Sequence, residues 1–188
     1  MRELIYSMTV SLDGYIAAPD GALDWSAPDD ELFRVHTDRV KETGVQLCGR
    51  RLYETMLYWE TAEESPLAPD QAEFAQLWKA LPKVVFSTTL ESVVGNARLA
   101  TEGVAEEVSR LKEQPGGDIG VGGAGLAAAC MALDLIDEWQ LFVCPVALGG
   151  GTPFLPARSE RTKLELIDTQ TFGSRVVHLR YRRAQARR

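Results

Sequence analysis

Short apolar runs alternate along the chain with longer segments of mixed apolar and polar residues. The short runs are rich in β-branched and aromatic residues, which is typical of strands. They predict strands over Glu3–Ser11, Val45–Cys48, Lys83–Ser87, Asp118–Val121, Gln140–Val146, Lys163–Thr171 and Val176–Arg182. The longer segments, several of which follow proline or threonine start signals, predict helices over Asp29–Thr43, Arg51–Met56, Asp70–Leu81, Val104–Glu113 and Ala124–Leu133.

The order of these elements predicts the fold class. Strand and helix follow each other several times, and three strands with no helix between them then close the chain. This order favours an α/β fold with a mixed, mainly parallel central sheet, flanking helices and a C-terminal antiparallel hairpin. No long linker or repeat interrupts it, so residues 1–188 are expected to form a single domain. Residues 63–69 are expected to form an exposed loop.

Composition and charge narrow the function. The net charge of −7 argues against nucleic-acid binding as the main role, and the arginines of Arg180–Arg188 are interpreted as a basic last strand and a frayed tail. No apolar run reaches membrane-spanning length, and the N-terminus has no signal-peptide pattern. Cys48, Cys130 and Cys144 each lie in an apolar run, without a Cys/His cluster to hold a metal. We expect a cytoplasmic protein with reduced thiols and no metal site.

Four glycines lie between Ile119 and Leu126, where an apolar run gives way to an alanine-rich helix. Unpaired amides and a positive dipole end make a helix N-terminus a seat for phosphate, and glycine lets the phosphate approach the main chain. The alternative is a tight strand-to-helix turn. A Rossmann site is disfavoured, because the segment comes late in the chain and no acid follows about 20 residues on.

The segment from Gly49 to Glu54 also follows an apolar strand and opens a helix with Arg50 and Arg51. Cations are unfavourable at a helix N-terminus, so a bound anion between the two arginines would stabilise this arrangement. The alternative is an exposed ion pair between Arg51 and Glu54.

Two further strand ends carry chemistry that suits a nucleotide. Ser87 and Thr88 place hydroxyls after one strand, and the turn signal Asp13-Gly14 follows another. Ligands of open α/β sheets bind at the carboxyl ends of parallel strands. The glycines, arginines, hydroxyls and this turn are therefore expected to gather at one edge.

Together these motifs resemble the dihydrofolate reductase-like fold. The motifs are Ser-Leu-Asp-Gly-Tyr-Ile-Ala, Gly-Arg-Arg-Leu-Tyr-Glu, a strand ending in Ser-Thr, and Val-Gly-Gly-Ala-Gly-Leu. More closely, the chain is similar to the C-terminal reductase domain of the bifunctional riboflavin-biosynthesis deaminase/reductase, which carries a Pro…Gly-Gly-Gly…Pro-Phe loop like residues 145–154. This resemblance covers nearly the whole chain. It implies an NADPH-dependent oxidoreductase, in homodimeric form, that transfers hydride to a pterin- or dihydrofolate-like compound or a riboflavin-pathway pyrimidine.

The resemblance also implies a cofactor site. The pyrophosphate would lie against Gly122, Gly123, Ala124, Gly125 and Leu126. The adenosine 2′-phosphate would lie among Gly49, Arg50, Arg51, Ser87 and Thr88, and the nicotinamide carboxamide would meet the backbone of Ile16 and Ala17.

The substrate site is expected near Trp25 and Asp30. The segment from Trp25 to Asp30 is similar to a dihydrofolate reductase segment in which a tryptophan precedes the substrate-binding acid by five positions. Asp30 is therefore expected to bind the substrate and to act as the catalytic acid. The alternative is structural: Asp29, Asp30 and Glu31 suit a helix N-terminus, with Ser26 as a possible N-cap.

Two other functions stay open from sequence. These alternatives are an NADPH-binding protein without catalysis and a reductase of an unrelated small carbonyl compound. His36 and His178 are expected in core or surface roles, too isolated in sequence to form a dyad, and Asp137-Glu138 is expected in an exposed turn.

Overall fold

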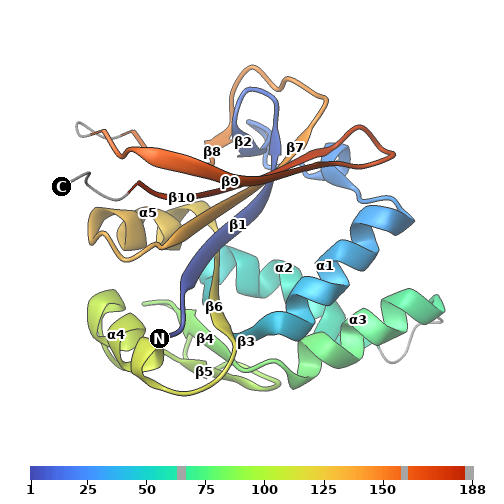
Figure 1. The fold of residues 1–188 in the computed structure, drawn as a ribbon. Helices are drawn as coiled ribbons and strands as arrows, with labels where there is room; N and C mark the ends of the chain where they lie inside the picture. Colours follow the sequence, from blue (N-terminus) through green and yellow to red (C-terminus); the bar gives the residue numbers. More distant parts are fainter. Residues whose placement is uncertain (63–66, 158–160, 185–188) are drawn as a thin grey trace.

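A computed structural model gives the fold and describes residues 1–62, 67–157 and 161–184 (Figure 1). Part of the predicted loop, residues 63–66, and the last residues of the basic tail, 185–188, lie outside the described residues. No helix in the described part of the chain is long and apolar enough to cross a membrane.

An eight-stranded sheet with the strand order β5-β4-β3-β6-β1-β7-β10-β9 forms the centre of the molecule. Its strands are β1 (Leu4–Ser11), β3 (Thr43–Gly49), β4 (Lys83–Phe86), β5 (Ala97–Leu99), β6 (Asp118–Gly122), β7 (Glu138–Cys144), β9 (Leu164–Thr171) and β10 (Val177–Arg183). The strands from β5 to β7 are parallel to their neighbours, whereas β10 runs antiparallel to both β7 and β9. The predicted mainly parallel sheet with a C-terminal antiparallel hairpin is confirmed.

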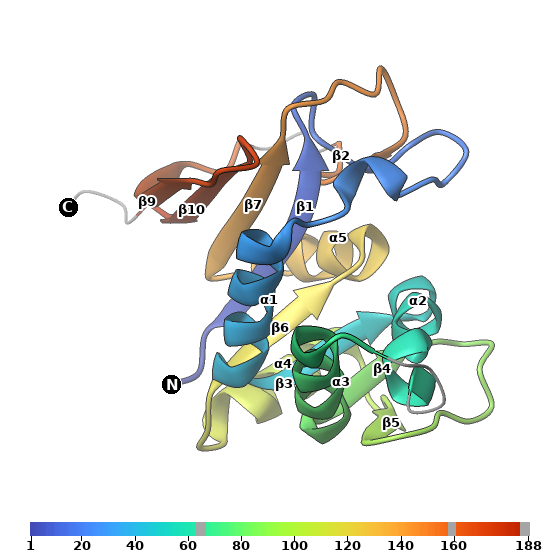
Figure 2. The same cartoon turned by 90° about the vertical axis from the view of Figure 1, so that its right-hand side faces the viewer.

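The helices cover both faces of the parallel part of the sheet (Figures 1 and 2). They are α1 (Asp30–Glu42), α2 (Arg50–Thr61), α3 (Pro69–Ala80), α4 (Val104–Glu113) and α5 (Ala124–Ala132), with a short 3-10 turn, η1 (Asp24–Ser26). Helices α4 and α5 pack on one face, where Val108 and Ala127 share a buried apolar cluster with Tyr6 of β1. On the other face, Phe74 and Trp78 of α3 pack with apolar residues of α1 and α2.

The elements that the sequence did not predict are very short. Strands β2 (Tyr15–Ala17) and β8 (Thr152–Pro153) pair with each other in a separate small sheet, and β5 is a three-residue edge strand. The helix predicted from Arg51 begins one residue earlier and continues to Thr61. Pro145 cannot donate a ladder hydrogen bond, and β7 ends just before it, at Cys144.

Candidate active site

The carboxyl ends of three parallel strands lie side by side at one edge of the sheet. Gly49, at the end of β3, is in register with Phe86 at the end of β4, and Cys48 is in register with Gly122 at the end of β6. The residues that follow these ends, Arg50, Ser87 and Gly123, carry the motifs predicted to bind a cofactor. The structure therefore brings the predicted phosphate-binding segments to one edge, as expected for an open α/β sheet.

The turn between β6 and α5 leaves backbone donors free. Gly123 has a φ of 90°, a conformation that L residues with a side chain rarely adopt, and it turns the chain directly into the helix. The first hydrogen bond of the helix runs from the Ala127 amide to the Gly123 carbonyl, so the amides of Ala124, Gly125 and Leu126 have no partner within the helix. A Cβ at Gly125 would meet nothing within 4 Å. These donors and this open space fit a pyrophosphate.

A second group of donors lies beside β4. Arg50, Ser87 and Thr88 line one surface hollow together with Phe86, Thr89, Ala100 and Glu102. The Arg50 guanidinium donates from Nε to Glu54 and from Nη1 to the Thr89 hydroxyl, both at 2.7 Å. The helical ion pair is thus made by Arg50, not by Arg51 as the sequence alternative had it. Arg51 is exposed one residue further along the helix.

Ile16 and Ala17 lie in β2, beyond the carboxyl end of β1. Their strand pairs with β8, with Ala17 opposite Thr152, and the Ile16 side chain packs against the main core. The segment predicted to bind the nicotinamide is therefore an extended strand held by its pairing with β8 and by the packing of Ile16.

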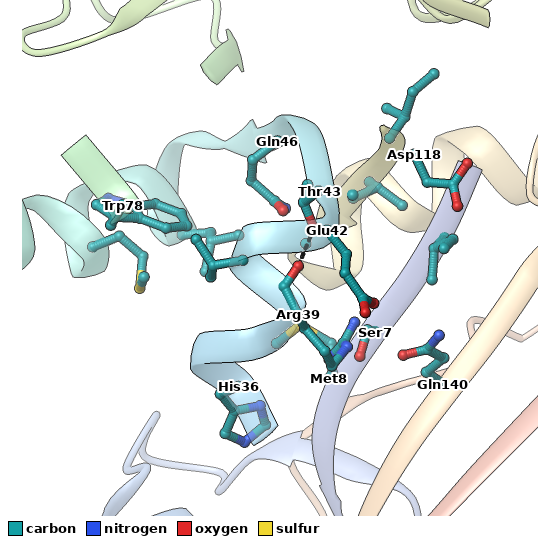
Figure 3. Close-up of a pocket in the computed structure, with 18 of the residues that line it drawn as sticks. Ser7, Met8, His36, Arg39, Glu42, Thr43, Gln46, Trp78, Asp118 and Gln140 are labelled. Carbon is teal, nitrogen blue, oxygen red and sulfur yellow. Dashed lines mark hydrogen bonds between the residues drawn. The ribbon is translucent and has the colours of Figure 1, made fainter. Parts of the chain in front are cut away.

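A cavity of about 310 Å³ lies between α1, α3 and the sheet (Figure 3). Its walls come from Ser7 and Thr9 of β1, Arg39 of α1, Thr43 at the start of β3, and Gln140 of β7, with Trp78 of α3 at one side. Gly120 and Gly122 of β6 also line it. Because Gly122 ends the strand that leads to the free amides of α5, the cavity adjoins the predicted pyrophosphate site.

Several polar atoms in this cavity have no hydrogen-bond partner among the described residues. They are the Ser7 hydroxyl, the Trp78 indole nitrogen and the Gln140 Oε1. The Gln140 Nε2 donates to Glu138 at 2.6 Å, and this bond turns its carbonyl oxygen away from Glu138. A buried polar group without a partner is costly, so at such atoms a water molecule or a ligand can supply the missing bonds.

Arg39 is the cationic residue of the cavity, whose lining also includes the carboxylates Glu42 and Asp118. Its guanidinium lies over the Phe142 ring, 5.3 Å from the ring centroid, and makes no ion pair or hydrogen bond with any described residue. Burial lowers its pKa to about 10, against the opposing effect of the Glu138 carboxylate. Arg39 therefore stays charged at neutral pH. In Figure 3 its side chain extends from α1 toward Ser7 on β1.

Two other buried charges of the described chain have counter-ions. Glu138 pairs with Arg180 and Arg182 at 2.8 and 3.3 Å, and Lys83 pairs with Glu60 at 2.6 Å. Glu138 is thus a buried residue of β7, and the exposed turn predicted for it is wrong. Arg39, which is half-buried, contrasts with these pairs, because its guanidinium makes no ion pair with any described residue.

Two histidines flank the same aromatic ring. His178 stacks on Phe142 with ring centroids 4.1 Å apart, and His36 meets the ring edge-on at 4.7 Å. Burial, together with the nearby Arg39 charge, lowers the pKa of each histidine to about 4. Core or surface roles are expected for both, and the structure has His178 buried and His36 half-buried, but they are not isolated from each other, because β10 brings His178 beside the ring that His36 contacts.

The residues predicted for the substrate site lie elsewhere. Asp29, not Ser26, caps α1: its carboxylate accepts from the Leu32 amide at 2.9 Å. Asp30 is exposed and lines a different surface hollow with Arg34 and Asp38, on the outer side of α1. The Trp25 indole donates to the Ala22 carbonyl at 3.2 Å. Neither Trp25 nor Asp30 lines the cavity, and the catalytic role of Asp30 stays a prediction.

Within the described part of the chain, no three His, Cys, Asp or Glu side chains are grouped to hold a metal ion. Cys48, Cys130 and Cys144 are free and buried.

Residues 2–178 match the family model of the RibD C-terminal domain. The chain belongs to this family. It is 33% identical over 181 residues to the uncharacterized protein YyaP of Bacillus subtilis (strain 168), covering 96% of this chain and 94% of that protein.

Solved structures agree with the fold of this RibD C-terminal domain. A putative riboflavin biosynthesis protein from Shewanella sp. PV-4 has a TM-score of 0.76 at 21% identity, covering 97% of this chain and 99% of that one. Dihydrofolate reductase from Enterococcus faecalis, solved with NADP(H) and RAB-propyl, has a TM-score of 0.61 at 17% identity, covering 97% of each chain. The dihydrofolate reductase-like fold and the family expected from the sequence motifs are confirmed.

Sequence reasoning missed the polar residues of the cavity in this RibD C-terminal domain. Ser7 carried no nucleophile motif, Gln140 was read only as the start of a strand, and Arg39 was not singled out. One signal was present in the sequence: Arg39 lies three residues after His36 and four before Thr43, on the helix face that meets the sheet. A positively charged residue on the helix face that packs against the sheet is unusual, and it indicates a polar site there.

Proposed function

We propose that this protein is an NADPH-dependent reductase that transfers a hydride to a heterocyclic substrate held in the cavity. One observation carries the proposal: Gly122 both lines a cavity with unpaired polar atoms and leads into the free amides of α5. A substrate in the cavity and a cofactor on these amides would therefore meet at the end of β6. The family and the structural relatives support a reductase of the riboflavin-biosynthesis or dihydrofolate reductase kind.

Different residues at the sheet edge would bind different parts of the cofactor. The amides of Ala124, Gly125 and Leu126, with Gly122 and Gly123, would hold the pyrophosphate. Gly49, Arg50, Arg51, Ser87 and Thr88 would surround the 2′-phosphate, and the backbone of Ile16 and Ala17 would bind the carboxamide. When bound, NADPH supplies the hydride, and the protein supplies position and electrostatics.

The cavity suits a compact heterocycle with both acceptor and donor atoms on its edge. Its volume of about 310 Å³ lies at the lower end of the range for small-molecule sites. Arg39 would donate to a carbonyl or anionic group, and the Gln140 Oε1 would accept from a ring N–H. A pterin or a riboflavin-pathway pyrimidine carries both kinds of group. A guanidinium directed at the ring would stabilise negative charge that develops on hydride transfer.

The preference for NADPH over NADH tests the cofactor site. Replacing both arginines, Arg50→Ala with Arg51→Ala, is expected to remove most of a preference of about tenfold to a hundredfold, because hydrogen bonds to charged groups contribute about 1.5–3 kcal/mol. Tryptophan fluorescence titration with each cofactor measures it. Arg34→Ala, an exposed arginine that lines a different hollow, is the matched control. Equal affinities of the wild type for the two cofactors would contradict the 2′-phosphate site.

The role of Asp30 has a direct test. Because its carboxylate is exposed and outside the cavity, we expect Asp30→Asn to keep turnover within about twofold of wild type, as surface substitutions change little. Steady-state kinetics with a saturating acceptor measures this. If turnover is lost while NADPH still binds, Asp30 is the catalytic acid that the sequence resemblance implies.

We also propose that the protein acts in the cytoplasm as a homodimer. The outer strand of the sheet supports the dimer: β9 is a sheet edge, and Leu166 and Ile167 on it are 49% and 41% exposed. Its three reduced, buried cysteines suit the cytoplasm. The molar mass in solution by light scattering decides between monomer and dimer.

A further inference from the structure

The turn after β1 is tied to a distant glycine-rich loop by one carboxylate. Asp13 accepts from the Leu148 amide at 3.0 Å and from the Gly149 amide at 2.7 Å. It also accepts from the Ser11 hydroxyl at 2.7 Å, and that hydroxyl in turn accepts from the Tyr15 amide at 3.0 Å. A single side chain thus connects the turn before β2 to residues 135 positions away in sequence.

The glycine-rich loop also touches the Ile16–Ala17 segment directly. Gly151 has a φ of 126°, and a Cβ there would lie 2.0 Å from the Ala17 carbonyl oxygen. No residue with a side chain fits at this position without moving Ala17. The Phe154 amide donates to the Gly14 carbonyl at 2.9 Å on the other side of the contact. The loop therefore packs directly against the strand proposed to bind the nicotinamide.

We propose that Asp13 is a positioning residue that holds Ile16 and Ala17 in place for the nicotinamide end of the cofactor. This inference rests on the proposed function. The Ser11 hydroxyl and the two loop amides lower the pKa of Asp13 to about 2, so the carboxylate is charged and the tie is intact at neutral pH. Because Asp13 is exposed and β1 and β7 are joined independently through their own register, removing it loosens the two loops and leaves the sheet intact.

The nearby Asp20 gives a matched control. It lies on the loop after β2, and within the described residues its carboxylate accepts only from the Ala22 amide, two residues away. Asp20→Ala removes an exposed carboxylate of the same size and charge without cutting the connection to the glycine-rich loop. Asp13→Asn keeps one carbonyl oxygen in place of the carboxylate and is expected to restore part of the effect of Asp13→Ala.

Two measurements on the whole protein test the proposal. First, without any cofactor, Asp13→Ala is expected to raise amide hydrogen exchange about tenfold at Ala17 and Gly149, with Asp20→Ala at wild-type rates. Unchanged exchange in Asp13→Ala overturns the proposal whether or not the protein is a reductase.

Second, Asp13→Ala is expected to weaken NADPH about tenfold and to leave the affinity for adenosine 2′,5′-bisphosphate, which lacks the nicotinamide, unchanged. Equal weakening of both ligands, or a large fall in melting temperature, shows a general structural role and overturns it too. If hydrogen exchange rises as expected but wild type binds no NADPH, the proposed function fails and so does the cofactor-positioning role, while the tie between the loops stands.

Discussion

Lowering the pH from 6.5 to about 5 is expected to reduce the free energy of unfolding by about 3 kcal/mol. The cause is the pair of histidines beside Phe142. In the folded protein burial holds the pKa of both near 4, whereas in the unfolded chain each returns to about 6.5. Between these values the unfolded state binds two protons that the folded state excludes, so stability is complete above pH 6.5 and falls as the pH decreases toward 4.

This loss is large compared with the typical total stability of about 5–15 kcal/mol. Asp13 does not contribute to it, because a carboxylate with a lowered pKa loses its contribution only at lower pH, toward its folded value of about 2. Urea unfolding at several pH values across this window measures the slope. The double variant His36→Gln with His178→Gln is expected to unfold with little pH dependence there, even if it is less stable at neutral pH. A slope that persists in this variant would assign the effect to other groups.

Most of the sheet could be predicted from the sequence, because its strands are short apolar runs whose type does not depend on distant residues. The helix over Val104–Glu113 was predicted with the observed bounds. What could not be predicted are the elements that exist only through their partners. Strands β2 and β8 have three and two residues and are defined by their pairing alone.

The residues predicted for the substrate site show a stricter limit. Successive residues of an α-helix point about 100° apart, so the choice of Asp29 as N-cap decides that Asp30 points outward, with Arg34 and Asp38. A residue that matches a family motif in sequence can therefore point away from the cavity, as Asp30 does. The polar cavity itself joins β1, α1 and β7, and its members become neighbours only after the sheet has formed. The common position of the segments predicted to bind phosphate was easier to predict, because the carboxyl ends of parallel strands must share an edge.

The cavity carries the second large prediction: Arg39→Met is expected to lower kcat/KM for the acceptor about a hundredfold. A guanidinium that binds a carbonyl or anionic group contributes about 1.5–3 kcal/mol, and it is worth more where the charge develops in the transition state. The affinity for NADPH is expected to stay unchanged, because Arg39 lies on α1, away from the amides and the arginine at the sheet edge. Arg39→Lys, which keeps the charge without the planar fork, is expected to be intermediate.

The effect of the same variant on stability separates a substrate-binding role from a structural one. Arg39 is charged and has no counter-ion among the described residues, so an apolar side chain of similar length is expected to leave the folded protein as stable or about 1 kcal/mol more stable. Arg180→Met is the matched control, because it takes a partner from the buried Glu138 and is expected to destabilise the protein by about 1–3 kcal/mol. Activity that falls while stability is kept places Arg39 in the substrate site. A parallel loss of both in Arg39→Met would show that the arginine serves the fold, and the proposed orientation of the substrate would fall with it.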